Sequence, residues 1–429
     1  MKIRMLASAA CAALMITAVP ISAASVPSAP TPFRMFGAVG GTDVDAFYAS
    51  RRGAPLWPSN GPDSPAAREL ISILQRSPID GLASGPELAG RAQAMISQSS
   101  GDPVALLAAD RLLSSAWVQY VQAVRRPPRG MTYADAWVAP RRQSPGETLQ
   151  VAAAAPSLAA HLRTVSAVNP FYAQLRDAAL ASGATDPRVL GTLERARALP
   201  ASGRYVVVDA AGARLWMVEN GSIVDSMKVI VGKPTSQTPM LASVIYYATL
   251  KPYWNVPPDL VQKLIAPRVL QQGMPYLKAH SYEVLDGPGE AGQPIAPNKV
   301  DWKAVAEGRA TVRVRQLPGP ANSMGQLKFG FANANDVYLH DTPNKDLFAQ
   351  DDRDLSNGCI RLEDAQRLGR WLVGSQPIAT SAQPEQHLLL PKSVPIYVTY
   401  FTARADGGQL SLIDDRYGRD TAAQMAALR

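Results

Sequence analysis

Residues that commonly bind metals or redox groups are scarce in this sequence, which has only two cysteines and four histidines among its 429 residues. It contains no H-E-x-x-H segment and no cluster of cysteine and histidine ligands, so we expect no metal-dependent hydrolysis and no cofactor. The net charge is +8, but the basic residues are scattered and form no nucleic-acid-binding motif, so a nucleic-acid partner is not expected. Apolar residues make up 47% and charged residues 18%, which is typical of a globular chain of two or three domains.

Long apolar runs are also missing, apart from one at the N-terminus. Lys2 and Arg4 precede an apolar run over residues 5–19, and the small residues Ser22-Ala23-Ala24 follow. This order is typical of a secretory signal peptide, and we predict that residues 1–24 are removed. A membrane anchor is the alternative, but the run is shorter than the roughly 20 residues that a span requires. We therefore expect an exported protein with no transmembrane segment after cleavage.

Removal of the signal peptide would take Cys11 with it and leave Cys359 as the only thiol. A lipidated Cys11 fits the sequence less well, because the apolar run continues past it. A single thiol cannot form an internal disulfide, and an unpaired thiol is a liability in an oxidising compartment. Either Cys359 is buried and inert, or it has a chemical use.

Helical patterns dominate the N-terminal part of the chain. Residues 25–43 are rich in serine, proline and alanine and are interpreted as a flexible leader, and a helical domain is predicted for residues 44–200. Its clearest helix begins at Asp102-Pro103, and apolar residues then recur at helical spacing as far as Val124. No cluster of reactive residue types lies in this domain. Its tryptophans are expected in the core: Trp57, Trp117 and Trp137.

A β-rich domain is predicted for residues 201–402. Valine and tyrosine become frequent here, and Asn220-Gly221 between two such segments is a strong signal of a two-residue hairpin. Residues 257–324 interrupt the strand signals with a helical stretch and a loop-rich segment, and such an insertion usually forms a lid or a binding element. The expected fold class is therefore α+β, and residues 403–429 are left as a C-terminal tail.

Reactive residue types meet in one stretch of the β domain. His340 ends a predicted strand, and Cys359 follows 19 residues later, just before a helix predicted over residues 363–373. An imidazole can take the proton of a thiol, whose ordinary pKa of about 8.5 is too high for reaction at neutral pH. Gly358 permits a turn that could aim the N–H groups of Gly358 and Cys359 at one oxyanion, and Arg361 could bind a carboxylate. This spacing alone is weak, and a buried cysteine with an unrelated histidine remains the alternative.

Two motifs in this stretch carry a family resemblance. His340-Asp341-Thr342-Pro343 and Ser356-Asn357-Gly358-Cys359-Ile360-Arg361 resemble the signature of the L,D-transpeptidase (YkuD-type) catalytic domain. Residues 230–234, 252–257 and 315–320 are similar to the large periplasmic subgroup of Gram-negative bacteria. Its helical scaffold domain is resembled by Phe47-Tyr48, Leu56-Trp57 and Asp80-Gly81-Leu82. The resemblance implies a scaffold domain followed by a β-sandwich catalytic domain, with a capping subdomain inserted at about residues 257–324.

The resemblance also implies roles for single residues. Cys359 would be the nucleophile and His340 the base, with the main-chain carbonyl of Asp341 orienting the imidazole. Tyr338 and Trp254 match aromatic positions that are expected to line the substrate cleft. Support of the nucleophile loop and of the oxyanion is assigned to Ser356, Asn357, Gly358 and Arg361.

The chain departs from the family pattern at three points. The residue before the glycine is often histidine in the family and is Asn357 here, so that His340 is the only candidate base. A small peptidoglycan-binding module often separates the two domains in this subgroup, but residues 172–193 run straight on and leave no room for it. Lys251 stands where asparagine is expected, and the sequence does not explain its effect.

The implied activity is acyl transfer between peptidoglycan stem peptides. Cys359 would attack the L,D peptide bond of a tetrapeptide stem, release D-alanine, and pass the acyl group to a diaminopimelate amine of a second stem. Donor and acceptor stems are thus the expected partners, carbapenems the expected inhibitors, and the periplasm the expected location. Hydrolysis by the same residues, as an L,D-carboxypeptidase or endopeptidase, remains an alternative. A non-catalytic wall-binding protein is a third reading, against which the intact Cys359, His340 and Arg361 argue.

Overall fold

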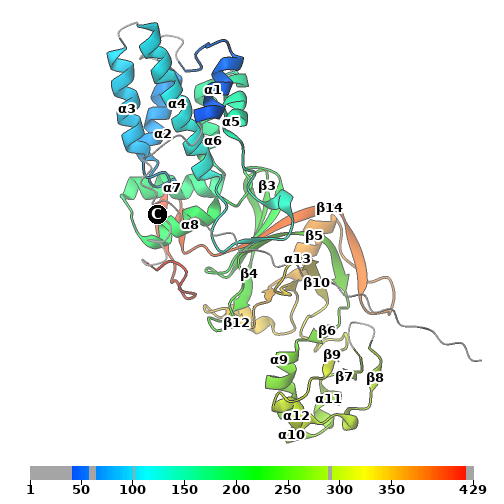
Figure 1. Cartoon of the computed structure of the whole chain (residues 1–429). Coiled ribbons are helices and arrows are strands. Elements are labelled where there is room, and N and C mark those ends of the chain that lie inside the picture. The colour runs from blue at the N-terminus through cyan, green and yellow to red at the C-terminus, as the bar shows by residue number, and fades with distance from the viewer. Residues whose placement is uncertain (1–40, 58–63, 100–101, 288–291, 422–429) are drawn as a thin grey trace, which may run out of the picture. The chain divides into compact units, whose positions relative to one another are not determined.

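The computed structural model describes residues 41–57, 64–99, 102–287 and 292–421. The predicted signal peptide and most of the predicted leader lie outside these ranges. Within the ranges, no helix is long and apolar enough to cross a membrane. Helices come first and strands dominate from residue 204 onward, so the α+β class predicted from the sequence is confirmed (Figure 1).

Six helices of the N-terminal part pack around one apolar core. They are α1 (Gly41–Ser50), α2 (Pro65–Arg76), α3 (Gly85–Gln98), α4 (Pro103–Val124), α5 (Pro145–Ala154) and α6 (Leu158–Ala167). The helix predicted from Asp102 is α4: the Asp102 carboxylate accepts a hydrogen bond from the Val104 N–H, and a proline follows the cap. In α5, Ser144 and Glu147 form a reciprocal capping box. The core buries Trp57 and Trp117, as the sequence predicts.

Trp137 departs from that expectation. It lies in a three-residue 3-10 turn, η2 (Ala136–Val138), and its side chain is 59% exposed. Val138 is the buried residue of this turn. The prediction that Trp137 lies in the core is therefore wrong. This tryptophan lies between α4 and α5, where no helical repeat of apolar residues indicates which side chains are buried.

The strands of the second part join in one ten-stranded sheet. Eight of them form a ring, because the last strand in the order also pairs with the first: β5 (Leu241–Leu250), β10 (Leu327–Phe331), β11 (Leu339–His340), β13 (Ile360–Leu362), β4 (Ser222–Gly232), β3 (Arg214–Glu219), β2 (Arg204–Asp209) and β14 (Gln386–Thr399). The two short strands outside the ring are β1 (Thr132–Tyr133), which pairs with β5, and β12 (Asp354–Ser356), which pairs with β4.

Both faces of this sheet are covered, which explains its nearly continuous apolar strands. In β2, Val206 and Val208 point into a core inside the ring, whereas Tyr205 and Val207 belong to a second core. That second core includes side chains of α7 (Pro170–Ser182) and α8 (Pro187–Ala196). Helix α13 (Ala365–Val373), which follows the nucleophile motif as predicted, contributes to the core inside the ring.

The hairpin predicted at Asn220-Gly221 is confirmed. Glu219 of β3 pairs with Ser222 of β4, so that two residues form the turn. Asn220 has φ 50° and Gly221 has φ 81°. Positive φ at both central residues is the turn geometry that matches the twist of the flanking strands, and asparagine and glycine adopt it most easily.

The insertion before β10 is a folded subdomain with its own core rather than a loop. Its four-stranded sheet has the order β6 (Trp254–Val256), β9 (Arg313–Gln316), β7 (Tyr282–Leu285) and β8 (Pro294–Ile295). Helices α9 (Pro258–Leu260), η3 (Val261–Ile265), α10 (Ala266–Gln272), α11 (Pro275–Ala279) and α12 (Trp302–Ala306) accompany it. Val261, Ile265, Val284 and Trp302 share one apolar cluster. Strands this short show too little alternation to stand out among prolines and glycines, which is why this stretch looked loop-rich in the sequence.

The C-terminal residues, which the sequence left as a tail, are also structured. A hairpin of β15 (Ala403–Asp406) and β16 (Gln409–Leu412) follows β14. Ala403 is buried in the same core as Tyr397 of β14 and Leu175 of α7. Residues 413–421 then return to the ring, where they contact the loop between β4 and β5.

Candidate active site

Three neighbouring strands place the predicted catalytic residues on one face of the sheet. The register pairs Lys328 of β10 with His340 of β11, and His340 with Arg361 of β13. Alternate residues of a strand point to the same face, so Cys359, two residues before Arg361, lies on the His340 face. The intervening residues Leu339 and Ile360 point the other way and are fully buried inside the ring. The parallel pairing of β11 with β13 therefore sets Cys359 and His340 on the same face of the sheet.

His340 is held as a neutral imidazole. Its side chain is 5% exposed, and Nδ1 lies 2.6 Å from the main-chain carbonyl oxygen of Asp341. A carbonyl only accepts, so Nδ1 carries the proton and Nε2 keeps a free lone pair. Burial and then the charge of Arg361 lower the pKa of His340 to about 4. The imidazole is therefore uncharged at pH 7, and its Nε2 is able to accept a proton.

Cys359 rests as a thiol rather than a thiolate. Burial raises the pKa of Cys359, and this outweighs the opposing effects of the Tyr338 N–H and of the cations Arg361 and Lys328. The hydrogen bond of its Sγ goes to the main-chain carbonyl of Asp336, at 3.8 Å, and not to the imidazole. The charges of Arg361 and Lys328 favour the thiolate form of this side chain over the thiol.

Lys328 is a site residue that the sequence analysis missed. Its Nζ lies 4.4 Å from the centroid of the Tyr338 ring, and its charge contributes to lowering the pKa of both Cys359 and His340. The signal was present in the sequence: Lys328 stands between Leu327 and Phe329, which are both fully buried. A lysine between two apolar strand residues points to the opposite face of the sheet, which here is the face of the nucleophile.

The turn around Cys359, the predicted nucleophile, is built on Ser356 and Gly358. The Ser356 hydroxyl donates to the Cys359 carbonyl at 2.6 Å and accepts from the Gly358 N–H at 3.1 Å. Gly358 has φ +118°, a conformation that residues with a side chain rarely adopt. Because the Gly358 N–H already has this acceptor, it is not free for an oxyanion, contrary to the sequence expectation. The Cys359 N–H, which has no hydrogen-bond acceptor among the described residues, is the better candidate. Asn357 is exposed and contributes its carbonyl to Ser236 Oγ at 3.3 Å.

The loop between β4 and β5 holds this turn from one side. The Thr238 hydroxyl donates to the Gly358 carbonyl at 2.8 Å and accepts from the Gly232 N–H at 2.9 Å. The Tyr417 hydroxyl donates in turn to the Gly232 carbonyl and accepts from the Thr238 N–H at 3.4 Å. Two successive layers of hydrogen bonds thus connect the C-terminal segment to the peptide that precedes the nucleophile.

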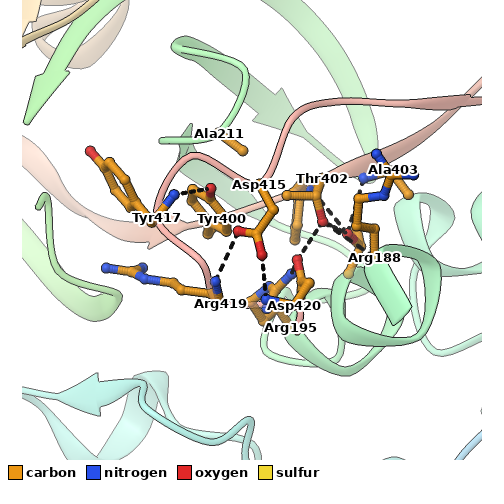
Figure 2. A network of polar contacts seen from close by, with 12 residues as sticks. Arg188, Arg195, Ala211, Tyr400, Thr402, Ala403, Asp415, Tyr417, Arg419 and Asp420 are labelled. Atoms are coloured by element: carbon orange, nitrogen blue, oxygen red, sulfur yellow. Dashed lines mark hydrogen bonds and ion pairs between the residues drawn. The ribbon is translucent and has the colours of Figure 1, made fainter. Parts of the chain in front are cut away.

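The C-terminal segment is itself anchored by a network of polar contacts, which Figure 2 shows. Asp420 pairs with Arg195 of α8 at 2.6 Å, and both side chains are buried. Arg419 donates to the Thr238 carbonyl at 3.0 Å, and the Asp415 carboxylate accepts from the N–H groups of Arg419 and Asp420. The ring of Tyr417 stacks on that of Tyr400 with centroids 5.0 Å apart. Residues at the end of the chain therefore support the nucleophile turn, a role that the sequence analysis did not foresee.

Asp341 connects the site to the insertion. Its carboxylate accepts from the Gln326 N–H at 2.9 Å and from Lys345 Nζ at 2.7 Å. A Cβ on Gly325 would lie 2.4 Å from this carboxylate, so any residue other than glycine at this position would clash with Asp341. The residue that orients His340 through its carbonyl thus also fixes the end of the insertion through its side chain.

The two predicted aromatic site residues lie in different parts of the structure. Tyr338 is half-buried on the face of the nucleophile, under Lys328. Trp254 belongs to the insertion, where its ring packs near that of Tyr282, with centroids 6.3 Å apart. Any contact of Trp254 with substrate would therefore come from the insertion and not from the ring of strands.

Comparison with known proteins follows the same division of the chain. The family model of the L,D-transpeptidase catalytic domain (YkuD) matches residues 203–381, and that of a scaffold domain matches residues 42–178. A Haemophilus influenzae protein, whose name assigns it provisionally to the L,D-transpeptidases, is 25% identical over 402 residues, 89% of this chain and 79% of that protein.

Solved structures similar to this chain include mycobacterial proteins. An L,D-transpeptidase from Mycobacterium smegmatis is 14% identical, with a TM-score of 0.24, over 47% of this chain and 60% of that one. L,D-transpeptidase 3 from Mycobacterium tuberculosis is 10% identical, with a TM-score of 0.24, over 46% of this chain and 61% of that one. This chain thus spans about three fifths of the length of each.

Proposed function

We propose that this chain, which belongs to the L,D-transpeptidase family, is an exported cysteine acyltransferase that cross-links peptidoglycan stem peptides in the periplasm. The observation that carries the proposal is the pairing of β11 with β13. It supports a thiol of Cys359 on the same face of the sheet as an imidazole whose Nε2 carries no proton, and that face also bears Lys328 and Arg361. A nucleophile, a base and two cations on one rigid sheet are the parts that acyl transfer requires.

The first step is acylation of the thiol by the donor stem. His340 Nε2 takes the thiol proton while Sγ attacks the carbonyl carbon of the L,D bond between diaminopimelate and the terminal D-alanine. The C–N bond then breaks, the imidazolium gives its proton to the leaving amine, and a thioester remains on Cys359. The Cys359 N–H is the donor placed to stabilise the oxyanion that forms in between.

The second step transfers the acyl group to the acceptor stem. A neutral diaminopimelate amine attacks the thioester carbon, and His340 accepts one of its protons. The C–S bond breaks, the new amide forms, and the thiolate recovers a proton. Water is present at tens of molar, so an amine wins only if it is bound and oriented, for which effective molarities of about 10⁵–10⁸ M are available.

The two cations of the site favour a substrate that carries a carboxylate. Arg361 is half-buried, and burial lowers its pKa. Its charge would therefore be stabilised by a nearby anion, such as the thiolate form of Cys359 or a carboxylate of the substrate. Lys328 stands on the opposite side of His340 in the sheet. The leaving D-alanine carries a carboxylate, and its binding beside these cations would offset their repulsion of the imidazolium that forms during catalysis.

The insertion, about residues 257–324, is proposed to cover the cleft. It has its own core and is fixed at its end by the contact of Gln326 with Asp341, next to His340. A cover over the thioester would exclude water and thereby favour the amine. Replacement of residues 257–324 by a short linker should therefore raise hydrolysis relative to transfer, or abolish substrate binding. An unchanged product ratio at full activity would remove this role from the insertion.

Incubation of the purified protein with tetrapeptide-stem muropeptides, followed by mass spectrometry, tests the proposed function. Cross-linked dimers should appear together with released D-alanine. Accumulation of shortened tripeptide stems alone, even at high acceptor concentration, would establish the hydrolase alternative and refute the transferase. Absence of both products while sacculi are still bound would support the non-catalytic wall-binding alternative.

Tyr417→Phe tests whether the C-terminal segment positions the nucleophile. The substitution keeps the ring stacked on Tyr400 but removes the hydroxyl that joins Gly232 to Thr238. Loss of a hydrogen bond to buried groups costs about 1–3 kcal/mol, so we expect kcat to fall roughly tenfold. KM should stay the same, since no substrate contact is removed. Steady-state kinetics on muropeptides measure both constants.

Tyr205→Phe is the matched control for this variant. Its hydroxyl also donates to a main-chain carbonyl, that of Pro200, at 3.0 Å, in a part-buried hydrogen bond far along the chain from the turn at Cys359. It should lower the thermal unfolding midpoint to a similar extent and leave kcat unchanged. Equal losses of kcat in the two variants would show that Tyr417 acts only through general stability.

A further inference from the structure

Four arginines that are separate in the sequence converge in the helical part of the chain. Arg125 and Arg126 end α4, and Arg141 and Arg142 lie in the segment before α5. A pocket of about 330 Å³ opens between the two segments. It is lined by Val121, Gln122, Arg125, Arg126, Arg142 and Gln143, with no acidic side chain among them. We call it the arginine pocket.

The charges of the arginine pocket are poorly compensated. Burial, and then the charge of Arg141, lower the pKa of Arg125, and no carboxylate contributes in the other direction. Burial and the charge of Arg125 likewise lower the pKa of His161 on α6. Glu147 pairs with Arg141 at 3.2 Å, which is the one ion pair recorded for these four arginines among the described residues. Four cations gathered around a single paired carboxylate favour the binding of an anionic ligand.

Helix dipoles do not account for the arrangement. The negative end of α4 is a favourable place for Arg125 and Arg126. Arg141 and Arg142, however, lie just before Ser144, the N-terminal cap of α5, where the helix dipole is positive and disfavours cations. The second pair therefore adds positive charge at a place where local structure does not call for it.

We infer that the arginine pocket is a second binding site for peptidoglycan, which holds carboxylates of the stem peptides away from the catalytic site. This inference rests on the proposed function, which supplies the wall polymer as ligand. Guanidinium groups bind carboxylates through paired hydrogen bonds, and the amides of Gln122 and Gln143 can bind peptide groups. A volume of about 330 Å³ admits part of a stem peptide. Such a site would recruit substrate in a chain that has no separate wall-binding module.

Co-sedimentation of the full-length mature protein with isolated sacculi tests the site. We expect Arg125→Gln/Arg142→Gln to bind at least tenfold more weakly, because two charge-assisted contacts are lost. Gln122→Glu should weaken binding as well, since its carboxylate would compete for the same arginines while every arginine remains. Arg91→Gln/Arg163→Gln is the matched control, because it removes two exposed charges from other helices of the same part. Equally weak binding by this control variant would show that binding to sacculi depends on the net charge of the protein and not on the arginine pocket, and would overturn the inference.

Two further arms identify the ligand and separate the inference from the proposed function. Sacculi stripped of stem peptides by an amidase should lose the dependence on the arginine pocket, and vesicles of anionic phospholipid should not bind through it. Pocket-dependent binding to stripped glycan or to vesicles would refute the assignment to stem peptides. Turnover of soluble muropeptides should be the same in the pocket variants and in the unmodified protein. Turnover without pocket-dependent binding would refute only the second site, and pocket-dependent binding without turnover would refute only the catalytic proposal.

Discussion

Substitution of Cys359 by alanine will abolish release of D-alanine and formation of cross-linked dimers. No other side chain can take its place, because Cys359 is the only cysteine among the described residues and the covalent route needs a thiolate. Cys359→Ser should be nearly as inactive, since an alcohol is a far weaker nucleophile beside the same imidazole. Mass spectrometry of muropeptides measures the loss directly.

Covalent labelling by a β-lactam tests the assignment of Cys359 as the nucleophile independently. If the thiol opens a carbapenem ring, the ring amide C–N bond breaks and a thioester joins the whole inhibitor to Sγ, so the protein gains one inhibitor mass. The unmodified protein should show this adduct in intact-mass spectra, and Cys359→Ala should not. Substantial turnover by the alanine variant, or an adduct on it, would contradict the assignment of the nucleophile.

The alanine variant should remain folded, so that its inactivity reports on chemistry. Cys359 is only half-buried, and its thiol contacts main-chain groups alone, the Asp336 carbonyl at 3.8 Å and the Tyr338 N–H. Removal of one sulfur from such a position costs little, about 1 kcal/mol or less. The thermal unfolding midpoint should therefore stay within a few degrees of that of the unmodified protein.

Local sequence patterns were sufficient to predict those structural features in which neighbours in the sequence are also neighbours in space. The Asn220-Gly221 hairpin, the capped start of α4 and the helix after the nucleophile all depend on residues only a few positions apart. The motif around Cys359 is of the same kind. Its turn is closed by hydrogen bonds between Ser356, Gly358 and Cys359.

Contacts between distant segments could not be predicted in this way. The hydroxyl of Tyr417 reaches Gly232, and Asp420 reaches Arg195, across separations of 185 and 225 residues. No periodicity records such a contact, and a short segment with tyrosine, arginine and aspartate resembles a solvated tail. The two arginine pairs illustrate the same limit. Each looks like an ordinary charged helix end in the sequence, and only the fold brings three of the four arginines to one pocket.

Lys328 lies between these two cases. Alternation within β10 shows that Lys328 points away from the core, and the motif predicts that His340 is the base. Neither observation reveals that β10 and β11 are neighbours with Lys328 opposite His340. Knowledge of the strand order was needed to place this cation at the site, because register across strands is set by the whole sheet.

His340→Asn should reduce turnover by about 10²–10⁴-fold, the usual contribution of a general base. Asparagine can still donate to the Asp341 carbonyl, so the variant tests the base rather than the local packing.

The free energy of unfolding should also respond to pH in a defined direction. The imidazole is neutral in the folded protein down to a pKa of about 4 and has an ordinary pKa of 6.5 when unfolded, so the folded state loses stability as pH falls through that interval. Denaturant unfolding measures the free energy of unfolding at pH 7 and at pH 5. Between these two pH values the unmodified protein should lose about 2 kcal/mol more of this free energy than the His340→Asn variant.

On the acid side of the pH–rate profile, the rate should fall at an unusually low pH for a reaction that depends on a histidine base. Activity requires the neutral imidazole, and burial, Arg361 and Lys328 together lower the pKa of His340 to about 4. The rate of carbapenem acylation should therefore stay level from pH 7 to about pH 5 and fall only near pH 4. Lys328→Met removes one of the two cations and keeps an apolar stem beside Tyr338, so the pKa of His340 should rise and the acid limb should move to higher pH. Lys299→Met, at an exposed lysine of the insertion, is the control for loss of a charge and should leave the profile in place. An acid limb at the ordinary histidine pKa, unmoved by Lys328→Met, would show that these cations do not control the base.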